Sequence, residues 1–415
     1  NDFKKSSKSK CGAMTKFMKK KSKSGLITVT PKKRTKGFLS SNISLSDFNH
    51  TDIKHLYERL INIKSNITKF NLSEKNLNIM NTIFLSYEKF IANKKINKED
   101  MILKQHENEE VKKISENNLP RYLIYRYKYN KYPKLKKIDD YPPCVQIEPT
   151  SICNYRCVMC YQVDKSFSNK SGGFMGHMSL DLFKNIIDQL AGNIESVTLA
   201  SRGEPTLNQN FSKMIEYAGN KFLALKVNTN ASMLNEKLIH DILSSNIQTI
   251  VFSIDAKDKK LYEKIRVNGK FEKIIKNLEL FNSIRNKHYK REDKIVRISG
   301  VKINNKQNLA EMKKKWGDIA DIIAFTNYTP WESSYENKIN DIKDPCNELW
   351  TRLFIWHDGK VNPCDYDYKS LLSKWNVKDK SVKEIWNSDE YNYLRSHHLK
   401  KLRKKIEPCK RCIST

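Results

Sequence analysis

The 415-residue sequence contains no long run of apolar residues and no pattern typical of a secretory signal. A helix that crosses a bilayer needs about 20 consecutive, predominantly apolar residues. We therefore expect no membrane span and no export by a cleaved signal. No internal repeat is evident, which argues against a repeat architecture. The sequence begins with Asn1 rather than Met, so the true start of the chain is left open.

Acidic residues are scarce beside basic ones, with 46 Asp and Glu against 77 Lys and Arg and a formal net charge of +31. Such a positive surface could bind RNA, a membrane face or anionic sugar phosphates. However, the chain is rich in Lys, Asn and Ile together, as AT-rich genomes produce, and it carries no motif of an RNA-binding fold. Much of the charge is therefore interpreted as a compositional bias, and nucleic-acid binding remains an alternative that we do not favour.

The amino-terminal third differs in character from the rest. Residues 1–36 hold thirteen Lys or Arg and a single acid, Asp2, so residues 1–40 are predicted to be a disordered basic arm that could contact nucleic acid. Residues 41–140 are predicted to be a mainly helical extension. The tyrosines between 122 and 132 alternate with basic residues and could stack bases, but packing against the next domain is the favoured interpretation.

Three cysteines near the middle of the chain, Cys153, Cys157 and Cys160, are spaced C-x3-C-x2-C. Three thiolates this close can hold one corner of an iron–sulfur cluster, and a four-iron cluster needs four ligands. The fourth iron is then open to chelate a small molecule. A zinc site is the alternative, but zinc sites favour paired C-x2-C modules with a matching pair downstream.

Apolar segments and amphipathic segments alternate after these cysteines, as in repeated βα units. A helix is predicted at 180–190, where Leu182, Phe183, Ile186, Ile187 and Leu190 share one face. Strands are predicted at 145–147, 196–200, 223–227, 249–252, 296–303 and near 322–325. Polar clusters follow the carboxyl ends of these strands, which is where α/β sheets carry their chemistry.

The cysteine triplet and these polar clusters together resemble the radical S-adenosylmethionine (SAM) superfamily. The resemblance implies a partial (β/α)6 barrel over residues 141–330, with the three cysteines as catalytic cluster ligands. It implies that Gly203, Glu204 and Pro205 hold the methionyl amine of SAM, although Arg202 replaces a usual glycine and is expected to face substrate. The other SAM contacts that it implies are Ser253 and Arg266 for the carboxylate, Asn228 and Asn230 for the ribose, and Gly300 for the adenine.

Four more cysteines follow the predicted barrel, Cys346, Cys364, Cys409 and Cys412. Residues 331–415 resemble the twitch domain, the shortened relative of the SPASM domain, and their spacing is similar to that of 2-deoxy-scyllo-inosamine dehydrogenases. The resemblance implies one auxiliary 4Fe-4S cluster with four thiolates and no open iron. A structural zinc ion is the alternative for this ligand set.

The resemblance also implies the activity. SAM would be cleaved reductively to a 5′-deoxyadenosyl radical that takes hydrogen from a small, carbohydrate-like substrate for oxidation or epimerisation, with reduced flavodoxin or ferredoxin as electron donor. Trp331, with Asn327 and Tyr328, is a candidate for the substrate pocket. The alternatives are a peptide-modifying maturase and a zinc-stabilised RNA-binding or RNA-modifying protein. Oxygen-sensitive clusters, without a signal sequence, predict a cytoplasmic location.

Overall fold

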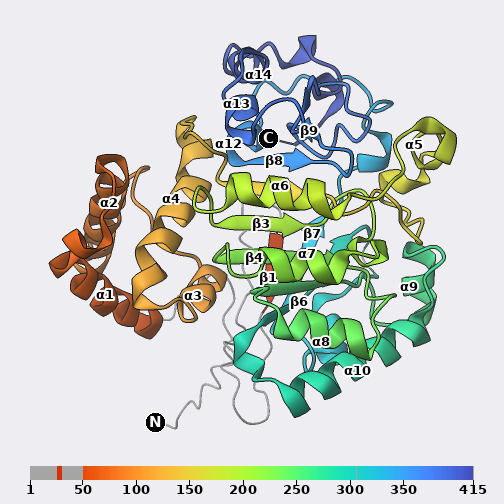
Figure 1. Cartoon of the computed structure of the whole chain (residues 1–415), viewed down its shortest axis with the longest axis horizontal. Coiled ribbons are helices and arrows are strands. Elements are labelled where there is room, and N and C mark those ends of the chain that lie inside the picture. The colour runs from red at the N-terminus through yellow and green to blue at the C-terminus, as the bar shows by residue number, and fades with distance from the viewer. Residues whose placement is uncertain (1–25, 30–49, 305, 415) are drawn as a thin grey trace, which may run out of the picture.

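A computed structural model describes residues 26–29, 50–304 and 306–414. The described residues form one sheet of ten strands in the order β1-β7-β6-β5-β4-β3-β2-β8-β9-β10 (Figure 1). From β7 to β2 the strand order runs against the chain order and all pairs are parallel, as expected for successive βα units. This arrangement confirms the predicted six-stranded partial barrel. Its strands are β2 (Cys144–Ile147), β3 (Ser196–Leu199), β4 (Ala224–Thr229), β5 (Thr249–Ser253), β6 (Ile295–Lys302) and β7 (Ile322–Asn327).

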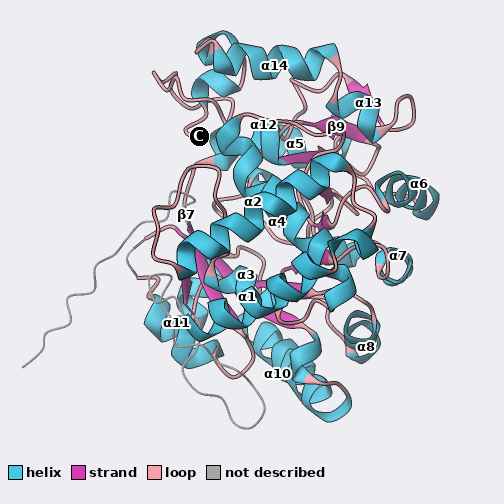
Figure 2. Ribbon diagram, turned by 90° about the vertical axis from the view of Figure 1, so that its left-hand side faces the viewer, coloured by secondary structure: helices cyan, strands magenta, loops and turns pink. Residues whose placement is uncertain are grey.

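Helices cover the outer face of the barrel, and Figures 1 and 2 show α6, α7, α8 and α10 side by side along it. The predicted helix at 180–190 is confirmed as α6, where Ser179 caps the first turn by accepting a hydrogen bond from the Leu182 amide at 3.2 Å. Its apolar side chains Phe183, Ile186, Ile187 and Leu190 are all buried. The barrel helices are α6 (Leu180–Leu190), α7 (Phe211–Ala218), α8 (Glu236–Ser244), α9 (Lys259–Ile265), α10 (Phe271–His288) and α11 (Leu309–Trp316).

The carboxyl-terminal segment continues the barrel sheet. β8 (Arg352–Ile355) pairs in parallel with β2, and the antiparallel strands β9 (Lys360–Asn362) and β10 (Trp375–Asn376) follow it. This brings the hairpin between β8 and β9 beside the carboxyl end of β2. The helices of this segment are α12 (Glu348–Thr351), α13 (Val382–Trp386) and α14 (Asp389–Leu399).

The amino-terminal extension is helical, as predicted, and packs on the side of the barrel (Figure 1). Tyr122, Tyr125, Tyr127 and Tyr132 are buried in its core, so they offer no surface on which bases could stack. Tyr129 is partly buried, and its hydroxyl accepts a 2.8 Å hydrogen bond from Arg352 of β8, so its ring is not free to stack on a base either. The helices are α1 (His50–Ser65), α2 (Glu74–Ile91), α3 (Gln105–Val111) and α4 (Leu119–Leu135).

The prediction of a disordered arm is wrong for four residues. Leu26–Val29 form β1, which pairs antiparallel with β7 at the edge of the barrel sheet. A short run of apolar and β-branched residues can add to an exposed strand edge even within a basic segment. The rest of the predicted arm lies outside the described residues. No helix in the described part of the chain is both long and apolar enough to cross a membrane.

Candidate active site

The segment that carries Cys153, Cys157 and Cys160 follows β2 and runs across the carboxyl ends of the strands. The three side chains line one cavity of about 360 Å³, together with residues from β2 to β7. Seven of the predicted SAM-contacting residues line the same cavity. They are Gly203, Glu204, Asn228, Asn230, Ser253, Arg266 and Gly300; the eighth, Pro205, is buried beside Glu204 and is not among the lining residues.

Gly203 allows a close approach between the strand β3 loop and the cysteine segment. A Cβ atom at this position would lie 2.3 Å from the Thr150 carbonyl oxygen and 2.5 Å from that of Ile152. The next residue, Glu204, donates its backbone N–H to the Ile152 carbonyl at 3.0 Å. The glycine thus fixes the carboxylate of Glu204 next to the cysteine segment.

Glu204 is a buried carboxylate, 3% exposed, that forms no ion pair with any described residue. Its oxygens accept hydrogen bonds from the Thr229 hydroxyl at 2.6 Å and the Asn230 amide at 2.7 Å. Burial raises the pKa of Glu204, and these hydrogen bonds oppose the rise. A buried carboxylate with neutral donors only is suited to receive a cationic ligand group such as an ammonium.

Arg266 also lines the cavity. Its guanidinium forms an ion pair with the buried carboxylate of Asp255, and its Nη1 lies 3.6 Å from the Cys157 sulfur. Asp255 also accepts a hydrogen bond from the Val301 amide at 2.6 Å, which ties the arginine to β6. Gly300, on the same strand, has no room for a side chain, because a Cβ atom would lie 2.4 Å from the Phe325 ring.

The two candidate ribose contacts differ in their surroundings. The Oδ1 atom of Asn228 is buried and has no hydrogen-bond partner among the described residues, so it is available to a ligand. Asn230 is already engaged: its side-chain amide donates to Asn154 at 3.0 Å and its Oδ1 accepts from the Ser232 amide at 2.9 Å. Asn230 therefore acts within this site chiefly by positioning Glu204.

The four carboxyl-terminal cysteines gather into a second group. Burial raises the pKa of Cys364 well above its usual value, and the nearby thiols of Cys409, Cys346 and Cys412 raise it further. Arg403, itself buried, donates to the Cys409 carbonyl at 3.0 Å and to that of Cys412 at 2.5 Å. All four are free thiols. The arginine thus organises the closing C-x2-C pair and supplies a positive charge beside the thiols.

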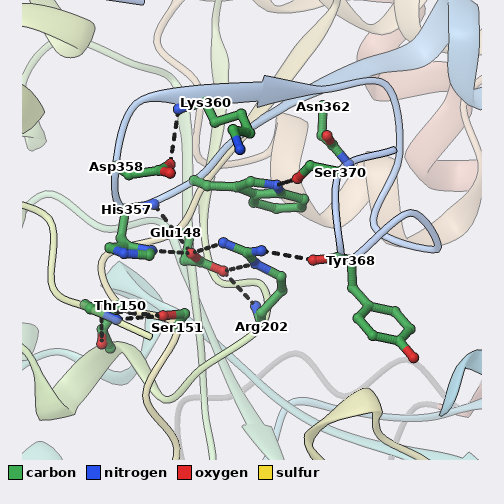
Figure 3. Close-up of polar contacts among 12 residues, drawn as sticks. Glu148, Thr150, Ser151, Arg202, His357, Asp358, Lys360, Asn362, Tyr368 and Ser370 are labelled. Carbon is green, nitrogen blue, oxygen red and sulfur yellow. Dashed lines mark hydrogen bonds and ion pairs between the residues drawn. The ribbon is translucent and has the colours of Figure 1, made fainter. Parts of the chain in front are cut away.

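Arg202 lines the cavity, but its guanidinium, which was expected to face substrate, is bonded within the protein. Figure 3 shows its guanidinium between Glu148 and Tyr368: Nε and Nη2 donate to the Glu148 carboxylate at 2.6 and 2.7 Å, and Nη1 donates to the Tyr368 carbonyl at 2.8 Å. The guanidinium lies 4.1 Å from the centre of the Trp356 ring. Arg202 is 3% exposed, and its guanidinium joins the barrel to the hairpin after β8.

The same Glu148 carboxylate contacts His357, whose Nδ1 lies 3.1 Å from Oε1 and whose backbone amide donates at 3.2 Å. Arg202 and His357 together lower the pKa of Glu148 to about 2, against the opposing effect of its burial. This group of charges fixes the auxiliary cysteine segment to the rim of the barrel.

Comparison with known families identifies both parts of the chain. The sequence profile of the radical SAM superfamily matches residues 147–314, and that of the iron–sulfur-cluster-binding SPASM domain matches residues 346–413. The chain belongs to the radical SAM superfamily. It is a radical SAM enzyme with a carboxyl-terminal SPASM domain, and its cofactors are SAM and 4Fe-4S clusters.

The chain is similar to several proteins that carry different names. The chain is 24% identical over 299 residues to the tungsten-containing aldehyde ferredoxin oxidoreductase cofactor-modifying protein of Pyrococcus furiosus, covering 60% of this chain and 82% of that protein. Among solved structures, it is similar to Streptococcus suis SuiB bound to precursor peptide SuiA (16% identity, TM-score 0.49, 71% and 80% covered). It is also similar to BtrN in complex with AdoMet and 2-DOIA (17% identity, TM-score 0.44, 66% and 93% covered).

Several residues of this radical SAM cavity escaped the sequence analysis. Asp365, directly after Cys364, lines it, as do Lys226 of β4 and Arg297 of β6. Of the three predicted pocket residues, Trp331 lines the cavity, whereas Asn327 and Tyr328 are not among its lining residues. Because side chains alternate between the two faces of a strand, the sequences of β4 and β6 could have predicted that Lys226 and Arg297 face the lumen. Asp365 reaches the cavity only because β8 pairs with β2, which is a contact between segments distant in the chain.

Proposed function

We propose that this radical SAM enzyme oxidises an alcohol of a small, carbohydrate-like substrate in the cytoplasm, with reduced flavodoxin or ferredoxin as electron donor. In this proposal Cys153, Cys157 and Cys160 hold the SAM-binding cluster, and Cys346, Cys364, Cys409 and Cys412 hold the auxiliary cluster. When bound, the clusters and SAM supply the radical that abstracts hydrogen and an acceptor for the electron left on the substrate. Glu204 binds the methionyl ammonium, and Ser253 with Arg266 binds the carboxylate.

The position of Asp365 carries the proposal. This carboxylate follows an auxiliary-cluster cysteine directly and lines the cavity that also holds Cys153, Cys157 and Cys160. Oxidation of a secondary alcohol to a ketone removes one hydrogen atom from carbon, one proton from oxygen and one electron. In this proposal Asp365, which lines the cavity, takes that proton as the general base.

The thiols of the cavity support oxidation over epimerisation. Epimerisation needs a hydrogen-atom donor on the face of the substrate opposite the radical. The cysteines that line the described cavity are Cys153, Cys157 and Cys160, all three of which the proposal uses as cluster ligands. A proton acceptor is therefore present in the cavity, whereas a spare thiol donor is not found among its described lining residues.

The lining of the cavity also supports a carbohydrate-like substrate. The cavity walls carry Gln146, Asn228, Ser299 and Thr326, beside the indole of Trp331. Polar groups that converge beside one aromatic ring are suited to a polyhydroxylated ligand.

The test is substrate-dependent turnover in anaerobically reconstituted protein. A panel of sugars, cyclitols and short peptides is incubated with SAM and dithionite, and ketone products are sought by mass spectrometry. We expect one 5′-deoxyadenosine per oxidised sugar or cyclitol, and we expect Asp365→Asn to lower oxidation by about 10²-fold or more while SAM is still cleaved. Modification of a peptide with no oxidised sugar would support the maturase alternative. Oxidation at an unchanged rate by Asp365→Asn would contradict the role of this base.

A further inference from the structure

Two basic side chains point into the lumen of the barrel below the candidate SAM contacts. Lys226 lies on β4 and Arg297 on β6, and both line the cavity. Along each strand, partly accessible residues alternate with fully buried ones, so Lys226 shares the inner face with Asn228 and Arg297 shares it with Ser299. The two cations thus belong to the substrate cavity and not to the outer packing of the helices.

Lys226 and Arg297 lie on two strands, β4 and β6, that are separated by the single strand β5. Asn228 of β4 pairs with Val251 of β5, which pairs with Arg297, while Lys226 pairs one inward-facing step lower with Thr249. Neighbouring strands lie about 4.8 Å apart, so β4 and β6 are separated by roughly 10 Å. Two long basic side chains that extend into the lumen from this separation can contact one anionic group together.

Neither cation forms an ion pair with any residue that the structure describes. The buried Nε atom of Arg297 also has no hydrogen-bond partner among these residues. Glu110, the acid whose charge reaches both, is already paired with Arg126 and accepts a hydrogen bond from Tyr122 at 2.6 Å. The nearby Arg352 is paired with Glu348 at 3.0 Å.

Burial and the positive charges of Arg352 and Arg297 lower the pKa of Lys226 to about 8, and burial lowers that of Arg297 to about 10. Both shifts reflect positive charge that is withdrawn from water without compensation. Such groups are costly to a fold unless a ligand completes them.

We propose that Lys226 and Arg297 form an anion site in the barrel lumen that binds a carboxylate or phosphate group of the substrate. This inference rests on the proposed function and deepens it, because it assigns a negative charge to the small substrate of the same cavity. A bidentate guanidinium together with an ammonium matches the oxygens of either group.

Equilibrium dialysis of radiolabelled inorganic phosphate tests the site without turnover. The full chain with both clusters is used anaerobically, with saturating SAM and at constant ionic strength, and malonate serves as a carboxylate competitor. We expect saturable binding of one phosphate per chain, displaced by malonate. Lys226→Met and Arg297→Met should each weaken phosphate binding at least about tenfold. The exposed control Lys273→Gln should bind as the wild type does.

The charge-retaining variants Lys226→Arg and Arg297→Lys separate loss of charge from a folding defect, and we expect them to bind phosphate within a few-fold of the wild type. Absence of saturable binding, equal binding by the Met variants, or phosphate binding that is found only when SAM is left out would each overturn the site. In the last case the cations serve the SAM carboxylate. Oxidation of a neutral sugar by a protein that binds no phosphate would reject the anion site and leave the proposed function intact.

Discussion

Arg202 and the pair Lys226 and Arg297 occupy the same barrel, yet their environments are opposite. Arg202 forms two hydrogen bonds with the buried Glu148, one with a backbone carbonyl, and a cation–π contact with Trp356. Lys226 and Arg297 have no acidic partner among the described residues. A buried cation that is paired with an acid is tolerated by the fold, whereas a buried cation without an acidic partner lowers stability and indicates a place for an anionic ligand. The comparison separates a structural charge from a functional one.

Removal of Arg202 is expected to have the largest effect on stability. Arg202→Met leaves Glu148 buried without its main partner, and such a change costs about 3–5 kcal/mol. We expect a large fall in the thermal midpoint of the anaerobic holoprotein. The double variant Glu148→Gln/Arg202→Met should recover much of the loss, because no unpaired charge remains. An unchanged thermal midpoint in Arg202→Met would show that the ion pair contributes nothing to the stability of the fold.

Acid provides a second test of the same interaction. The folded-state pKa of Glu148 is lowered to about 2, below its unfolded value of about 4.3. Its contribution to stability is therefore complete above about pH 4.3 and is lost as the pH falls toward 2. Between pH 5 and 3, the wild type should lose stability faster than Glu148→Gln/Arg202→Met. Parallel stability curves for the two proteins would argue against this assignment.

Glu204 is the acidic counterpart of Lys226 and Arg297, since it too is buried without an opposite charge among the described residues. Glu204→Gln keeps acceptors for the Thr229 and Asn230 donors but removes the charge offered to the SAM ammonium. We expect SAM affinity, measured by equilibrium dialysis, to fall at least about tenfold with little change in thermal midpoint. Glu216→Gln, on the outer surface of α7, is the matched control. Normal SAM affinity in Glu204→Gln would remove this residue from the SAM site.

The smallest expected effect on stability belongs to the lumen cations. Because they are uncompensated, Lys226→Met and Arg297→Met should leave the free energy of unfolding unchanged or raise it by about 0–1 kcal/mol. Substrate oxidation should nevertheless fall in both variants. Thermal unfolding of the two variants beside Arg202→Met checks the ranking. Destabilisation as large as that of Arg202→Met would mean that Lys226 or Arg297 serves the fold.

The sequence predicted the features that depend on local pattern. Apolar strands followed by polar turns predicted the six parallel strands, and the spacing of Cys153, Cys157 and Cys160 predicted the family. The pairing of β8 with β2 was not predictable in this way, because a four-residue strand joins a sheet only through contacts distant in the chain. That pairing determines the contacts of Arg202, because its partners Glu148, Trp356 and Tyr368 come from segments up to 166 residues away. It also brings Asp365 into the cavity.

The central claim is that the chain holds two separate clusters, of which the one on Cys153, Cys157 and Cys160 cleaves SAM. The most direct test measures iron and 5′-deoxyadenosine in anaerobically reconstituted protein reduced with dithionite. We predict about eight iron atoms per chain in the wild type and about four in Cys409→Ala/Cys412→Ala, given two four-iron clusters. SAM cleavage should survive in part in the double variant and disappear in Cys157→Ala. Undiminished cleavage by Cys157→Ala, or zinc in place of iron at the carboxyl-terminal cysteines of the wild type, would contradict the assignment of two iron–sulfur clusters.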